Sequence, residues 1–242
     1  MQPIDIVITT WQREWMTKAC LKALRQNTMT PHRIILIDNG SNYIDQAHYL
    51  MDSDIYLKLD RNYGLEHAKW LGMAFVESDL FVSMDNDILV YKYEDKDWLQ
   101  QLVDLMEKYP EYGAIAPRPQ ILVATGNIFE GKEDQELVDF GHVPGYARIM
   151  RTKWVLEVGA WKDKAPLRGH EELWIGEKFR DKGYKMAWAN HIQCWHMFGV
   201  EDTDGWGYPK GMSPEEHGHN PVWPLPQNDR DLIKEKVGID LP

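Results

Sequence analysis

The chain has 242 residues, of which 43% are hydrophobic and 27% are charged, a composition that excludes a disordered chain and is typical of a globular protein. Acidic residues outnumber basic ones by 38 to 27, so the formal net charge is −11. This charge argues against non-specific binding to nucleic acid or to an anionic membrane surface, because both need basic side chains. An anionic substrate would therefore need a local basic patch or a metal ion.

The two cysteines, Cys20 and Cys194, cannot make a disulfide framework, which indicates a reducing compartment. No apolar run approaches the ~20 residues that span a bilayer. Asp5 interrupts the short apolar stretch at the N-terminus, and no cleavage site follows, so the sequence predicts no signal peptide. We expect a cytoplasmic protein without a membrane span, and the sequence leaves its oligomeric state open.

The first half alternates short apolar runs with amphipathic stretches. This alternation predicts an α/β fold, in which a mostly parallel sheet is flanked by helices and ligands bind beyond the carboxyl ends of the strands. The expected strands are Ile4–Thr9, Arg33–Ile37, Ile55–Leu59, Leu80–Met84 and Gly113–Ala116. The expected helices are Glu14–Arg25, Leu65–Val76 and Asp97–Lys108.

The second half has a different pattern. Pro144-Gly145 between apolar flanks predicts a hairpin over Phe140–Met150, and a helix is expected over Glu171–Lys182, followed by a strand over Tyr184–Ala189. Thr125–Glu136 is polar and predicts a mobile loop. We divide the chain at residues 117 and 200, and we expect residues 201–242 to form a C-terminal tail or lid, with Gly205–His219 as the lid.

Asp85-Asn86-Asp87 directly follows an expected strand. Two carboxylates at this spacing can reach one divalent cation, and hard oxygen ligands suit Mn²⁺ or Mg²⁺, which would bridge to substrate phosphates. The alternative is a polar turn that ends the strand. Asp38-Asn39-Gly40-Ser41 also follows a strand, and it is either a plain β-turn or a contact for a nucleobase or ribose.

Three further groups each have a structural and a functional interpretation. Thr9, Thr10 and Arg13 end the first strand, where hydroxyls and a helix N-terminus can hold a nucleotide. Glu171 and Glu172 open a helix, so their charges either complement its dipole or supply a general base. His196, among aromatic residues, is either a core residue or a metal ligand.

The order and spacing of these motifs resemble one known family. The segments IVITTWQR, ILIDNGSN, Asn62-Tyr63-Gly64 and FVSMDND resemble the nucleotide-sugar domain of family-2 glycosyltransferases with the GT-A fold. MRTKWVLEVGAW resembles that family's segment ending in Gly-Gly-Phe, and GHEELWIGEKFRDKGYK resembles its helix that begins Glu-Asp. The resemblance covers residues 4–200. It implies that residues 1–117 form a nucleotide-sugar-binding half and that residues 118–200 form an acceptor and catalytic half.

The resemblance implies a role for each matching residue. The donor would be bound beside Asp85-Asn86-Asp87, the D-x-D segment, by Thr9, Thr10, Arg13, Asp38, Asn62, Gly64, Lys69, Asp85 and Asn86. The metal would be held by Asp85, Asp87 and His196, with Asp87 the more direct ligand. The base would be Glu172, where the family usually has Asp, and its neighbour Glu171 is a rival. Two other departures are Lys69 in place of a frequent Arg and Trp70 in place of a frequent Asn.

The implied reaction is an inverting transfer from a nucleotide-diphosphate sugar, with UDP favoured, to an acceptor hydroxyl on a glycan. The metal neutralises the leaving group, while Glu172, its pKa lowered by the helix dipole, accepts the proton. The acceptor would be contacted by Trp161, His170, Trp174 and Trp195, with Trp206 as a further stacking candidate. Two alternatives are a nucleotidyltransferase, although ITTWQREW lacks that class's glycine-rich loop, and a catalytically inactive sugar- or nucleotide-binding module.

Overall fold

The computed structural model describes residues 2–42, 47–120, 128–163, 171–197 and 227–240. Its strands are β1 (Ile4–Thr10), β2 (His32–Asp38), β3 (Ile55–Lys58), β4 (Leu80–Asp85), β5 (Ile88–Val90), β6 (Tyr112–Pro119), β7 (Leu137–Asp139), β8 (Ala147–Arg151) and β9 (Lys185–His196). Its helices are α1 (Glu14–Asn27), α2 (Ala47–Asp52), α3 (Leu65–Met73), α4 (Trp98–Lys108), α5 (Thr152–Val158), α6 (Glu171–Asp181) and α7 (Gln227–Val237).

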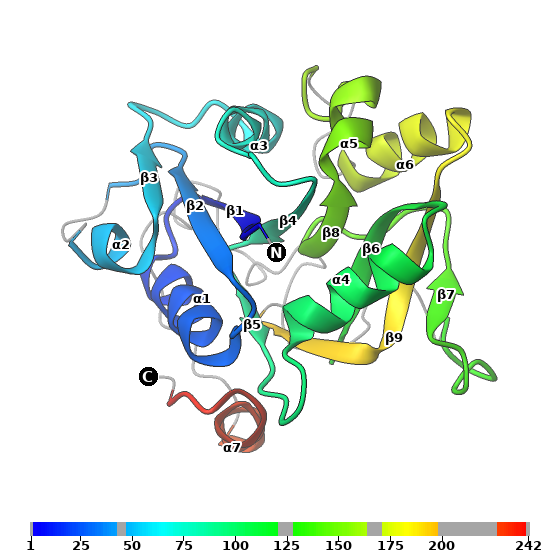
Figure 1. Cartoon of the computed structure of the whole chain (residues 1–242). Helices are drawn as coiled ribbons and strands as arrows, with labels where there is room; N and C mark the ends of the chain where they lie inside the picture. Colours follow the sequence, from blue (N-terminus) through cyan, green and yellow to red (C-terminus); the bar gives the residue numbers. More distant parts are fainter. Residues whose placement is uncertain (1, 43–46, 121–127, 164–170, 198–226, 241–242) are drawn as a thin grey trace, which may run out of the picture.

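The strands form one mixed sheet in the order β3-β2-β1-β4-β8-β6-β9-β5, with β7 paired to β9 (Figure 1). The run β3-β2-β1-β4 is parallel throughout, as is the pair β6-β9, whereas β8, β5 and β7 run antiparallel to their neighbours. Helices α3, α5 and α6 lie on one side of the sheet, and α1 and α4 lie on the other (Figure 1). The predicted α/β fold, with a sheet flanked by helices, is confirmed.

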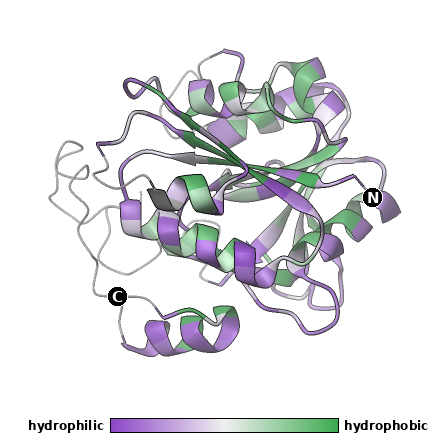
Figure 2. Ribbon diagram, turned by 60° about the vertical axis from the view of Figure 1, so that its left-hand side comes forward, coloured by the Kyte–Doolittle hydropathy of each residue, from purple (hydrophilic) through white to green (hydrophobic). Residues whose placement is uncertain are grey.

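The core lies between the sheet and these helices. All seven residues of β1 are buried, and the apolar faces of the helices turn toward the sheet (Figure 2). Helix α3 packs against β1 and β2 at very short range, because Gly72 has no side chain: a Cβ there would lie 2.4 Å from Cγ1 of Val7. Asp97 caps the N-terminus of helix α4, and its carboxylate accepts hydrogen bonds from the backbone N–H groups of Leu99 and Gln100.

The hairpin predicted over Phe140–Met150 is wrong. β7 pairs with β9, whereas β8 inserts between β4 and β6, so the two strands that flank the turn join different partners. The apolar run of β8 indicated a strand but not its partner, because every neighbour in a buried sheet is equally apolar. β9 extends to His196, well past the predicted end at Ala189, after a shift in its register with β6 beyond Pro117.

The C-terminal helix α7 packs against the first half of the chain. Ile233 and Val237 are fully buried. The side-chain amide of Asn27 donates to the carbonyl oxygens of Val90 (2.9 Å) and Val237 (2.8 Å), which ties α1, β5 and α7 together. The predicted lid, Gly205–His219, lies outside the described residues, as does part of Thr125–Glu136. The division at residues 117 and 200 stays a prediction.

Candidate active site

The strand ends bring several predicted residues to one edge of the sheet. β1 lies between β2 and β4, with Thr10 paired to Asp38 and Thr9 paired to Asp85. Since these strands are parallel, their carboxyl ends meet at the same edge, where α/β proteins bind ligands. The last residue of β9, His196, pairs with Ile88 directly after the D-x-D segment.

Asp87 lies between two basic side chains. Its Oδ2 accepts a hydrogen bond from Nη1 of Arg13 at 3.1 Å, and its Oδ1 lies 3.5 Å from Nε2 of His196. Arg13 and the preceding Gln12 have φ angles of 62° and 56°, a left-handed conformation that is strained for residues other than glycine. Burial opposes ionisation of Asp87, but His196 and Arg13 outweigh it and lower its pKa. Burial likewise opposes the charged form of His196, whose pKa is nevertheless raised, mainly by Asp87.

The carboxylates of Asp85 and Asp87 fit a divalent cation of the Mg²⁺ or Mn²⁺ type. Oδ1 of each residue is buried and makes no hydrogen bond. Burial raises the pKa of Asp85, partly offset by Lys69. No three His, Cys, Asp or Glu side chains among the described residues are already arranged around one point as metal ligands. These two oxygens with His196 would therefore make an incomplete ligand set, which a diphosphate and water can complete.

Glu171 lies at the centre of a buried charge cluster. Its Oε1 accepts a hydrogen bond from Nζ of Lys69 at 2.8 Å, and Nη2 of Arg148 lies 3.1 Å from Oε1 and 2.9 Å from Oε2. Nε1 of Trp161 also donates to Oε2, at 3.1 Å. Burial opposes the carboxylate, but Arg148 and Lys69 lower its pKa to about 2. Through Lys69, which is 3.4 Å from Oδ1 of Asp85, the cluster reaches the D-x-D segment.

Glu172, the next residue, is half-buried and outside this cluster. Burial and the neighbouring charge of Glu171 raise its pKa above the ordinary value. The expectation that the helix dipole lowers this pKa is therefore wrong, because desolvation and a like charge next to it outweigh the dipole. A carboxylate with a raised pKa is a stronger proton acceptor, and its role as a base stays a prediction.

Sequence reasoning missed Arg148 and the part that Gly145 plays. Arg148 is one of two arginines in β8. Unlike Arg151, which ends the strand, it lies between two apolar residues, and this was the signal that could have revealed it. A Cβ at Gly145 would lie 2.5 Å from Oε1 of Glu171, so the glycine leaves room for the carboxylate. The turn read as a hairpin thus lies against the charge cluster.

Several residues predicted to bind the donor make hydrogen bonds within the protein. Asp38 is fully buried: its Oδ1 accepts from the backbone N–H of Ser41 at 2.8 Å and its Oδ2 from the hydroxyl of Tyr56 at 3.0 Å. The amide of Asn39, another residue that the sequence did not single out, donates to Oδ1 of Asn62 at 2.8 Å and to the carbonyl oxygen of Gly64 at 3.1 Å. These bonds fix the loop that leads into α3.

Asn86, the middle residue of the D-x-D segment, makes hydrogen bonds to two threonines. Its Nδ2 donates to the hydroxyl oxygens of Thr10 (3.1 Å) and Thr17 (2.8 Å), so both of its N–H groups are used within the protein. Thr9 differs, because its buried hydroxyl makes no hydrogen bond. Among the polar side chains at this strand end, Thr9 thus has capacity left for a ligand.

The tryptophans predicted to stack on sugars separate into two groups. Trp161 and Trp195 are each only 2% exposed, so neither ring has a face open to a sugar. Trp174 is half-buried on α6, with Nζ of Lys178 4.0 Å from its ring centre, and it remains the described aromatic that fits the acceptor prediction. His170 and Trp206 lie outside the described residues.

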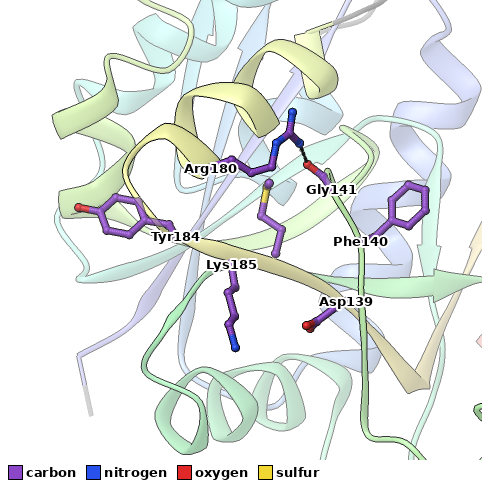
Figure 3. A pocket seen from close by; sticks show the side chains of 7 residues that line it. Asp139, Phe140, Gly141, Arg180, Tyr184 and Lys185 are labelled. Atoms are coloured by element: carbon purple, nitrogen blue, oxygen red, sulfur yellow. Dashed lines mark hydrogen bonds between the residues drawn. The ribbon is translucent and has the colours of Figure 1, made fainter.

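A pocket of about 290 Å³ lies at the other end of β9, near Lys185 and Asp139 (Figure 3). Its polar groups are engaged with the protein: Arg180 donates to the carbonyl oxygen of Gly141, and Asp139 accepts from the hydroxyl of Tyr112. This pocket is separated from the D-x-D segment by the length of β9. It is therefore not part of the candidate active site around Asp85 and Glu171.

Comparison with known families now identifies the chain's relatives. Residues 5–168 match the family described as glycosyl transferase family 2. The chain belongs to this family. It is also 28% identical over 95 residues to the teichoic acid poly(glycerol phosphate) polymerase of Staphylococcus epidermidis, an alignment that covers 36% of this chain and 13% of that protein.

Solved glycosyltransferase structures share the fold. GalNAc-T7 with UDP, GalNAc and Mn²⁺ superposes with a TM-score of 0.68 at 15% identity, covering 96% of this chain and 48% of that one. The mannosyltransferase PcManGT of Pyrobaculum calidifontis, with GDP-Man and Mn²⁺, superposes with a TM-score of 0.65 at 12% identity, covering 82% of this chain and 57% of that one. Residues 1–349 of S. aureus TarS superpose with a TM-score of 0.60 at 12% identity, covering 80% of this chain and 60% of that one. The chain spans about half the length of these proteins. Their shared architecture confirms the predicted GT-A fold.

The described residues contain no helix long and apolar enough to cross a membrane.

Proposed function

We propose that this chain is an inverting, metal-dependent glycosyltransferase that moves a sugar from a nucleotide-diphosphate donor to an acceptor hydroxyl. The observation that carries the proposal is the convergence, at one sheet edge, of the Asp85 and Asp87 carboxylates with the start of α6. Oδ1 of each aspartate is buried without a hydrogen bond, as expected of groups that await a cation. Family membership favours this reaction over nucleotidyl transfer.

Some of these residues would act on the donor and its metal ion, and one would act on the acceptor. Asp85, Asp87 and His196 would hold Mn²⁺ or Mg²⁺, which supplies positive charge to the diphosphate as it leaves. On the other side, Glu172 would accept the proton of the acceptor hydroxyl, and its raised pKa strengthens it for that role. Thr9, with its unused hydroxyl, would contact the donor.

A UDP-sugar is the favoured donor and a glycan hydroxyl is the favoured acceptor. Support for a nucleotide sugar comes from the fold shared with GalNAc-T7, solved with UDP, and with PcManGT, solved with GDP-Man. We place the protein in the cytoplasm, with no nucleic-acid partner, on the strength of its charge of −11 and its cysteine content.

A donor screen tests the proposal. Calorimetric titration of a panel of nucleotide sugars with Mn²⁺ should find one that binds far better than the rest, and the purified protein should slowly hydrolyse that donor without an acceptor. Asp87→Ala is the matched control. It should neither bind a donor in the presence of Mn²⁺ nor hydrolyse one. Donor binding without any hydrolysis or transfer would favour the inactive binding module, and the absence of binding to every donor would contradict the proposal.

A further inference from the structure

The ammonium group of Lys69 lies between two carboxylates. Its Nζ is 2.8 Å from Oε1 of Glu171 and 3.4 Å from Oδ1 of Asp85, and the side chain is 1% exposed. The shorter distance is a hydrogen bond and the longer one is an ion pair without one. Nζ also donates to the carbonyl oxygen of Gly145, at 3.4 Å. Of the two carboxylates, Glu171 therefore holds Lys69 by a hydrogen bond, while Asp85 keeps an oxygen that makes none.

Glu171 is itself fixed from two other directions. Arg148, on β8, binds both of its carboxylate oxygens, and Trp161 donates to Oε2. Gly145 lies close to Oε1, where a side chain would displace the carboxylate: a Cβ at this position would be 2.5 Å from Oε1. Since these partners come from different elements, the position of Glu171 is determined by the fold, and so is the position at which it holds Lys69.

We infer that Glu171 is a positioning residue for the metal site: by binding Lys69, it keeps the ammonium group from closing on Asp85 and leaves Oδ1 of Asp85 to the divalent cation. This inference rests on the proposed function. Without the Glu171 charge, Asp85 is the remaining carboxylate next to Lys69, and a buried ammonium group moves to its remaining anion. Lys69 would then compete with the metal for the same oxygen.

The test is the effect of Mn²⁺ on nucleotide affinity, which needs no turnover. UDP, and GDP in parallel, are titrated by calorimetry into the full chain with excess Mn²⁺ and again with EDTA. The ratio of the two affinities reports metal binding at the site. Glu171→Gln should lower this ratio by roughly 10–100-fold, the usual effect of removing a group that orients a metal ligand. Glu177→Gln, an exposed substitution on the same helix, should leave it unchanged.

A second variant separates positioning from mere structural support. Glu171→Gln combined with Lys69→Met removes one buried charge of each sign, so it disturbs folding less than the single change and also removes the competing cation. Its ratio should return to within about threefold of the wild-type value. A folded Glu171→Gln protein with a wild-type ratio, or a double variant in which the ratio stays low, would overturn the inference. If Mn²⁺ did not raise the affinity of the wild-type protein for either UDP or GDP above its value in EDTA, this result would contradict the proposed function instead.

Discussion

Nε2 of His196 lies 3.5 Å from Oδ1 of Asp87, which brings the last residue of β9 against the segment that follows β4. The two residues are far apart in the sequence, and β5 connects them by pairing antiparallel to β9. Oδ2 of the same carboxylate is bound by Arg13, so each oxygen of Asp87 has a different neighbour. Oδ1, with no hydrogen bond, is the oxygen available to a cation.

We expect tight metal binding only when a nucleotide diphosphate is present, because two carboxylates and one imidazole leave the ligand shell of Mn²⁺ incomplete. EDTA should abolish transfer, and Asp87→Ala should lose nucleotide-dependent Mn²⁺ binding. Electron paramagnetic resonance of free Mn²⁺, with and without UDP, measures this directly. Asp95→Ala, a change well beyond the D-x-D segment, is the control. Full activity in EDTA would contradict the metal's role.

The sequence predicted the first half of the fold well, because its strands and helices alternate and each is long enough to show its own periodicity. It did not predict which strands β7 and β8 join, since pairing in a buried sheet depends on contacts between distant segments. The D-x-D carboxylates were singled out by their place after an expected strand, and the resemblance to a family then assigned both of them and His196 to a metal site. Arg148 was missed because its partner Glu171 is 23 residues further along the chain, and no sequence pattern shows that the two side chains meet in the fold.

Stability should depend on pH through Glu171. Its pKa in the folded protein is about 2, below the ordinary value of 4.5, so folding favours the ionised form. The stabilisation is complete above about pH 5 and is lost as the pH falls toward 2, because the unfolded chain takes up the proton first. At 1.36 kcal/mol for each pKa unit, it amounts to about 3 kcal/mol.

Urea unfolding of the wild type and of Glu171→Gln measures this contribution. The difference between their unfolding free energies should be largest near pH 6 and should shrink toward pH 3. Glu177→Gln, on the exposed face of α6, should follow the wild type at every pH. A difference that is constant across this range would show that Glu171 does not titrate as the buried cluster requires.

Gly72→Ala should destabilise the protein by about 1–3 kcal/mol, because the added methyl group would overlap Cγ1 of Val7 at the interface of α3 and β1. The overlap outweighs the gain of about 1 kcal/mol in helix propensity that alanine brings. Thermal or urea unfolding gives the value. Val7→Ala in the same chain removes the overlapping atoms, so the double variant should be more stable than the sum of the two single changes predicts. Strict additivity would mean that the two positions are not in contact.

Glu172→Gln tests the general base, and it keeps the shape of the side chain while removing its ability to take a proton. The transfer rate should fall by roughly 10²–10⁴, the usual contribution of a positioned base, while donor affinity stays within about twofold. Because the pKa of Glu172 is raised, the wild-type rate should fall as the pH drops through a value above 4.5, and this acid limb should disappear in the variant.

Glu171→Gln, assayed at saturating Mn²⁺, is the matched comparison for the base. It should lose far less rate than Glu172→Gln and should keep the acid limb, because Glu171 is bound by Lys69 and Arg148 and has no free oxygen facing an acceptor. If the two variants exchanged these results, Glu171 would be the base and the buried cluster would have to open during turnover. If neither variant lowered the rate tenfold, the proton would go to another group, and Asp163, exposed just after Trp161, would be the next residue to change.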